Sequence, residues 1–124
     1  MKFTESRLQG AWVVEIEKIG DDRGFFGRAW CEREFREHGL NTQIRQINTS
    51  HSREKGTLRG LHYQADPCQE VKFVRCIQGR IFDVMVDLRP DSPTFLQWDG
   101  YELSAENGRM LYVPEHFATG FLTL

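Results

Sequence analysis

The chain has 124 residues, of which 40% are hydrophobic and 27% are charged, so it is long enough to form one globular domain, 1–124, around a single core. Its net charge of -2 gives no general attraction to phosphate backbones, which argues against nucleic acid as a partner. No apolar run approaches the roughly 20 residues of a membrane span, and the chain shows no signal peptide and no CxxC pair, which predicts a cytoplasmic setting without membrane contact.

Short segments in which apolar and polar side chains alternate recur along the chain. The alternation predicts about nine β-strands, at 11–19, around 24–30, and at 42–48, 57–64, 70–77, 80–88, 96–103, 108–113 and 117–124. Gly, Pro, Asn and Asp residues mark turns between these segments. Only residues 31–38, CEREFREH, have helical character. The pattern predicts an all-β sandwich or barrel with one short helix.

The segment 71–88 predicts a hairpin. If Gln78-Gly79 is a two-residue turn, Val74 lies opposite Asp83, and Lys72 lies diagonal to Asp83 on the same inward face. A buried ammonium and carboxylate are costly unless they meet each other, water or a ligand. The hairpin by itself leaves open a binding site, a structural ion pair, or a lysine that reaches the rim.

The stretch LRGLHYQ, residues 58–64, places a guanidinium, an imidazole and an amide on one predicted strand. Arg59 and His62 face opposite sides of a regular strand, so both reach one cavity only if the chain bulges, which Gly60 permits. A packed or surface histidine is the alternative. Converging polar groups favour a small-molecule pocket, and further candidates for its lining are Gln46, Asn48 and Lys72.

Six segments carry a resemblance to a known family, in order and with its spacing: DDRGFF (21–26), QIN (46–48), KGTLRGLHYQ (55–64), KFVRCIQGRIFDVMVDLRPDSPTF (72–95), LSAENGRMLYVPE (103–115) and GFLTL (120–124). They resemble the dTDP-4-dehydrorhamnose 3,5-epimerases, which are cupin-type jelly rolls of nucleotide-sugar metabolism. The resemblance implies an isomerase that inverts C3, C5 or both on a dTDP-4-keto-6-deoxyhexose.

The resemblance also implies roles for individual residues. His62 matches the family's general base, and Lys72 and Arg59 match residues that contact the substrate. Arg23 matches an arginine that, in family dimers, reaches the nucleotide of the neighbouring subunit, which predicts a homodimer. The remaining matches line the nucleotide-sugar site or lie close to the base: Gln46, Asn48 and Asp83.

The chemistry of a 4-keto sugar explains why these residue types are needed. The ketone acidifies the protons at C3 and C5, so a neutral imidazole can remove one and leave an enolate. A fixed cation such as Lys72 stabilises the charge that develops on the ketone oxygen. Arg59 and Arg23 suit a pyrophosphate, because a guanidinium matches its oxygens with a planar fork of donors. The reaction requires no redox cofactor.

The chain departs from the family pattern near its last strand. The usual family run is PEGFAHGF, whereas this chain has PEHFATGF, so His116 replaces a glycine and Thr119 replaces a histidine. Family members continue past GFLTL and carry there a tyrosine that acts as general acid and an aspartate that orients the base. We therefore expect the sequence to lack a C-terminal segment of the family. A metal-binding cupin needs at least three ligands, and only His62 and Glu70 are available here, which predicts no metal site.

Two other functions remain alongside the epimerase. The first is a nucleotide-sugar binding module that keeps the fold and the anion site without full catalysis. The second is a 3,4-ketoisomerase on the same scaffold.

Overall fold

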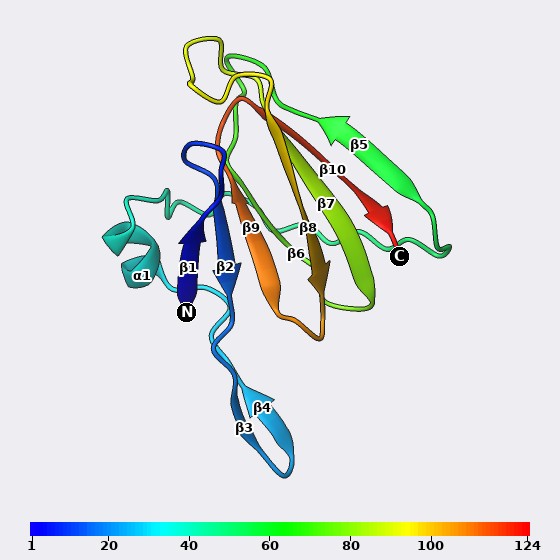
Figure 1. Ribbon diagram of the computed structural model, residues 1–124. Coiled ribbons are helices and arrows are strands. Elements are labelled where there is room, and N and C mark those ends of the chain that lie inside the picture. The colour runs from blue at the N-terminus through cyan, green and yellow to red at the C-terminus, as the bar shows by residue number, and fades with distance from the viewer.

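A computed structural model describes residues 1–124, and most of its strands lie in two four-stranded antiparallel sheets (Figure 1). The first sheet has the order β1 (Lys2–Glu5), β2 (Trp12–Glu15), β9 (Arg109–Val113), β6 (Lys72–Arg75). The second has the order β5 (Leu58–His62), β10 (Phe117–Thr123), β7 (Arg80–Asp87), β8 (Trp98–Ser104). The prediction of an all-β sandwich with one short helix is confirmed.

The core lies where the inward faces of the two sheets meet. Alternate residues of each strand point inward, so Val13 and Leu111 from the first sheet pack with Met85 and Phe117 from the second. The other buried members are Leu8, Ala11, Ile81, Leu103 and Val113. Burying apolar surface on both inner faces is the main favourable contribution to the stability of such a sandwich.

Helix α1 (Glu32–Glu37) covers the outer face of the first sheet. Its residue Phe35 is buried and packs edge-on against Phe3 of β1 and Phe73 of β6, with ring centroids 5.4 Å and 5.0 Å apart. The helical character predicted for residues 31–38 is confirmed. No helix in the structure has the length and apolar character that a membrane crossing requires.

A two-stranded hairpin projects away from the sandwich (Figure 1). It consists of β3 (Ile19–Asp21) and β4 (Gly24–Phe26), with Ile19 opposite Phe26. Both residues are exposed, because this hairpin packs against neither sheet of the chain.

One predicted strand is absent, and one strand of the structure was not predicted. Residues 42–48 form no strand, and Ile44 and Ile47 are exposed. No strand of either sheet pairs with this segment, and a strand needs a neighbour to bond its backbone N–H and C=O groups. Conversely, β1 was not predicted, because its sequence KFTE has a single large apolar residue, Phe3, and so shows no alternation.

Strands β6 and β7 do not form the hairpin predicted over 71–88. β6 pairs with β9, where Val74 lies opposite Leu111, while β7 lies between β10 and β8 in the other sheet. The predicted pairing was wrong because two strands show the same alternation of apolar and polar residues in either of two arrangements. They can be hydrogen-bonded neighbours in one sheet, or they can face each other from the two sheets of a sandwich. The predicted inward face is correct, since Val74 and Cys76 pack against the core that holds Ile81 and Met85.

Candidate active site

A cavity of about 580 Å³ is lined by strands of both sheets. Strand β5 contributes Arg59 and His62, β6 contributes Lys72, β7 contributes Asp83, and β10 contributes Thr119. The apolar part of the lining comes from Leu58, Val74 and Phe121. Four residues that the sequence singled out therefore meet in one place, although they come from three strands in two sheets.

A β-bulge turns Arg59 and His62 to the same face. His62 lies opposite Thr119, and Arg59 lies opposite Phe121, so two residues of β5, Gly60 and Leu61, face only one residue of β10. Thr119 and Phe121 both point inward, and their partners do the same. The bulge predicted at Gly60 is present. His62 stays exposed because it lines the cavity from an edge strand.

Two glycines allow β5 and β10 to approach closely at the bulge. Gly60 has a φ of 107°, and a Cβ there would lie 2.7 Å from the Cα of Gly120 and 2.9 Å from the carbonyl oxygen of Thr119. A Cβ at Gly120 would lie 2.5 Å from the carbonyl oxygen of Arg59. The obstructing atoms belong to the backbone, so a side chain at either position would have to push the strands apart.

We expect Gly60→Ala to destabilise the fold by about 3 kcal/mol or more, because it combines a positive φ with a clash against backbone. Gly56→Ala is the matched control: Gly56 has a φ of 81°, and a Cβ there meets nothing within 4 Å. The control should lose only about 1–2 kcal/mol of conformational energy. Urea unfolding of both variants measures the difference, and equal losses would contradict the close approach.

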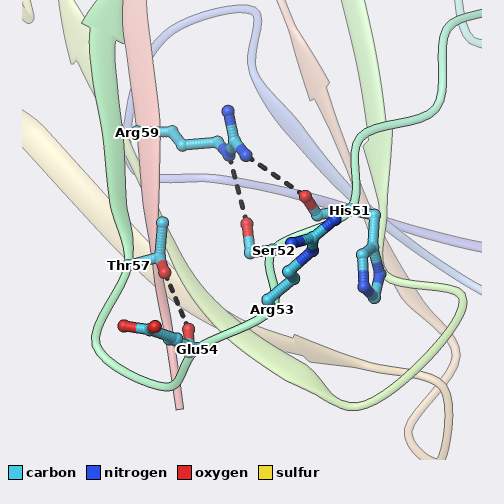
Figure 2. Close-up of a pocket in the computed structure, with 6 residues that line it drawn as sticks. All are labelled: His51, Ser52, Arg53, Glu54, Thr57 and Arg59. Atoms are coloured by element: carbon cyan, nitrogen blue, oxygen red, sulfur yellow. Dashed lines mark hydrogen bonds between the residues drawn. The ribbon is translucent and has the colours of Figure 1, made fainter.

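Arg59 also lines a second cavity, of about 320 Å³, on the loop before β5 (Figure 2). Its Nε donates to Ser52 Oγ at 3.1 Å, and its Nη2 donates to the carbonyl oxygen of His51 at 3.2 Å. Figure 2 shows the side chain of Arg53 beside them. No apolar residue lines this cavity, and the guanidiniums of Arg53 and Arg59 outnumber the single carboxylate of Glu54, so its net positive charge suits an anion. Sequence reasoning missed Arg53 and Ser52, because a loop has no periodicity that shows where its side chains point.

Lys72 forms an ion pair with Glu70 rather than with Asp83. Its Nζ lies 2.8 Å from Glu70 Oε1, and both side chains are partly exposed. Asp83 is 1% exposed, and its Oδ1 accepts a hydrogen bond of 2.9 Å from Thr119 Oγ1. Burial raises the pKa of Asp83 to about 6, and the Thr119 hydroxyl only partly opposes this. Lys72 and Asp83 line the same cavity, as predicted, but they do not form an ion pair.

Three predicted site residues lie outside this cavity. Gln46 and Asn48 are exposed on the segment that forms no strand. Arg23 lies at the turn of the β3–β4 hairpin, where its side chain is 90% exposed and its Nη2 pairs with Asp21 Oδ2 at 2.6 Å. Within one chain the structure does not bring these three residues to the cavity, and their roles remain predictions.

The two residues of PEHFATGF that differ from the family pattern, His116 and Thr119, lie in different surroundings. Thr119 lines the cavity, whereas His116 does not, and His116 Nε2 lies 3.8 Å from Asp66 Oδ1. His116 has a φ of 61°, a conformation that glycine adopts at lower cost. His116 therefore does not replace the histidine that the family pattern has at position 119. The structure brings together no group of three or more His, Cys, Asp or Glu side chains that could hold a metal ion.

Comparison with known proteins bears on this arrangement. The family described as dTDP-4-dehydrorhamnose 3,5-epimerase matches residues 5–124. The chain belongs to this family. The dTDP-4-dehydrorhamnose 3,5-epimerase of Shigella flexneri is 42% identical over 125 residues, and that of Methanothermobacter thermautotrophicus is 46% identical over 123 residues. The alignments cover 100% and 99% of this chain, but only 68% and 65% of those relatives.

Solved epimerase structures share the fold over the whole chain. The dTDP-4-dehydrorhamnose 3,5-epimerase from Bacillus anthracis, with TDP and PPi bound, has a TM-score of 0.93 and 47% identity, covering 99% of this chain and 70% of that one. The epimerase from Legionella pneumophila, in complex with dTDP-4-keto-L-rhamnose, has a TM-score of 0.90 and 40% identity, covering 99% and 65%. The resemblance seen in the sequence is confirmed at the level of family and fold.

Proposed function

We propose that this chain binds a dTDP-4-keto-6-deoxyhexose and inverts C3, C5 or both through an enolate. The observation that carries the proposal is that His62, Lys72 and Arg59 line one cavity. Membership of the epimerase family supports the substrate class. No redox step is involved, because each inversion removes one proton from a carbon and delivers another proton to the opposite face of the same carbon.

In this reaction His62 removes the proton next to the ketone, since a neutral imidazole is a base of suitable strength near neutral pH. Lys72 lies on the facing sheet and stabilises the negative charge on the ketone oxygen. Arg59 joins the two cavities, so the sugar occupies the larger one while the pyrophosphate meets Arg59 and Arg53 in the smaller one. In this arrangement Gln46 and Asn48 contact the nucleotide sugar from their exposed segment.

Solvent exchange tests this proposal. The protein is incubated with dTDP-4-keto-6-deoxyglucose in deuterated water, and proton NMR follows label and configuration at C3 and C5. We expect label at one or both carbons. Absence of label, together with dTDP binding measured by calorimetry, would contradict the proposal and favour the binding module.

We also propose that the chain acts as a homodimer in which Arg23 reaches the partner's cavity. Arg23 lies at the turn of the β3–β4 hairpin, which projects away from the sandwich (Figure 1). The outer face of the second sheet exposes Phe82 and Leu122. Sedimentation velocity should show a dimer. An Arg23→Ala variant should remain dimeric and bind dTDP more weakly, and a stable monomer would contradict the arrangement.

A further inference from the structure

Strand β7 carries two buried aspartates whose surroundings differ. Asp87 accepts hydrogen bonds from Arg89 Nε at 2.9 Å, from Ser92 Oγ at 2.5 Å and from Thr94 Oγ1 at 2.7 Å. Asp83 lies on the same face of the strand, and its one side-chain partner is the Thr119 hydroxyl at 2.9 Å. A cation and several donors stabilise the ionised form of Asp87, whereas Asp83 lacks comparable support.

No cation compensates for a charge on Asp83. Lys72 is paired with Glu70, and the Arg59 guanidinium is turned toward His51 and Ser52. His62 lines the same cavity but forms no ion pair with Asp83. Directly opposite Asp83 lie Tyr101 on β8, whose hydroxyl donates to Asp99, and the apolar Phe121 on β10. The charged and titratable side chains around Asp83 are therefore Arg59, His62, Lys72 and Tyr101.

Thr119 Oγ1 has two oxygen neighbours within hydrogen-bond distance. It lies 2.9 Å from Asp83 Oδ1 and 2.9 Å from the carbonyl oxygen of Val84. A hydroxyl has one proton, so it serves two acceptors at once only by sharing that proton in a weaker three-centre hydrogen bond. If Asp83 is ionised, the two contacts share the one proton of Thr119. If Asp83 carries a proton, it donates to Thr119, and Thr119 donates to Val84, so each contact has a proton of its own.

We propose that Asp83, which faces His62 and Lys72, carries a proton at mildly acidic pH and donates it to Thr119, and that it loses this proton as the pH rises toward neutrality. On ionisation the Thr119 hydroxyl turns from the Val84 carbonyl to the carboxylate. Burial, which raises the pKa of Asp83 to about 6, agrees with this arrangement. Thr119 is thus a positioning residue that serves both forms of the acid.

The inference deepens the proposed function and rests on it for its consequence in the reaction. An enolate develops negative charge beside Lys72, and an ionised Asp83 in the same cavity would repel that charge and attract the ammonium. A neutral Asp83 leaves the full charge of Lys72 available to the substrate, and ionisation of Asp83 as the pH rises offsets part of that charge. The second carboxyl oxygen of Asp83, Oδ2, has no hydrogen-bond partner in the protein. Fully buried side-chain oxygens in this structure all have one, so Oδ2 is not fully buried and remains accessible from the cavity.

Carbon NMR of the protein alone tests the inference, so its outcome does not depend on whether the proposed reaction occurs. The protein is labelled with ¹³C at the aspartate side-chain carboxyls, which are followed from about pH 3 to about pH 8, a range that spans ordinary and raised aspartate pKa values. The variants Asp83→Asn and Asp87→Asn identify the two signals. Thr119→Val removes the hydroxyl at nearly constant shape, and Thr119→Ser retains it.

We expect Asp83 to titrate with a midpoint of about 6, while Asp87 stays ionised over most of the range. Thr119→Val should raise the midpoint of Asp83, because the hydroxyl binds the charged carboxylate more strongly than the neutral acid, and Thr119→Ser should leave the midpoint near the wild-type value. An Asp83 midpoint in the ordinary range of aspartate would overturn the inference. So would a midpoint that Thr119→Val leaves unchanged, and the wild-type titration decides the matter even if that variant does not fold.

Discussion

His62→Ala should lower the rate of deuterium incorporation at C3 and C5 of dTDP-4-keto-6-deoxyglucose by roughly 100-fold to 10,000-fold, the range expected for a lost general base. The imidazole lies on the cavity side of β5, opposite Thr119, and no other histidine lines this cavity. Because His62 is exposed, its removal should leave folding almost unchanged. Proton NMR in deuterated water measures the rate, and thermal unfolding checks the fold.

His38→Ala is the control for this substitution. His38 follows helix α1, and its ring stacks on Phe3 with centroids 4.0 Å apart, on the far side of the first sheet from the cavity. Its loss should reduce stability slightly and leave the exchange rate at the wild-type value. Exchange that persists at the wild-type rate in His62→Ala would mean that another group is the base.

Lys72→Met should lower the rate of exchange by roughly 100-fold to 1,000-fold, as removal of one oxyanion-stabilising donor does in other enzymes. The Met side chain is unbranched and one atom shorter than that of lysine, so it occupies the space of the lysine stem beside Val74 without the charge. The effect should fall on the rate at saturating substrate, because the charge on the ketone oxygen develops in the transition state. Steady-state exchange kinetics separate that rate from the affinity.

Lys2→Met provides a matched control, because Lys2 also pairs with a glutamate, Glu15, at 3.3 Å, but lies on β1 away from the cavity. Exposed pairs of this kind contribute about 0.2–1 kcal/mol to stability. The control should therefore exchange at the wild-type rate. A Lys72→Met variant that binds substrate more weakly but turns it over at an unchanged rate would assign Lys72 to binding alone.

Local sequence patterns predicted the parts of the fold that depend on nearby residues. The alternation in 80–88 and 117–124 identified β7 and β10, because a strand with one buried face repeats every two residues. Gly60 identified the bulge on β5, because a positive φ and a close backbone approach both favour glycine. These features arise from the chain's own stereochemistry, so they can be recognised without knowledge of the partner strands.

The pairing of strands could not be recognised in this way. Lys72 and Asp83 were expected on neighbouring strands of one hairpin, but they belong to different sheets, and Lys72 pairs with Glu70. The segment around Gln46 and Asn48 has an alternating pattern yet forms no strand, because no strand of this chain lies beside it. Hydrogen-bonding partners are chosen by contacts between residues far apart in the sequence.

The sequence by itself determined the sandwich class, the family, and the residue types that the proposed chemistry needs, among them His62, Lys72 and Arg59. Only the tertiary structure decided which of them meet. Arg59 and Arg53 line one cavity, and His116 lies near Asp66 instead of in the larger cavity. Buried Asp83 has Thr119 as its hydrogen-bond partner. The physical reason is that the burial and hydrogen bonding of a side chain depend on what surrounds it in three dimensions. A sequence pattern, by contrast, shows only which face of its own strand that side chain occupies.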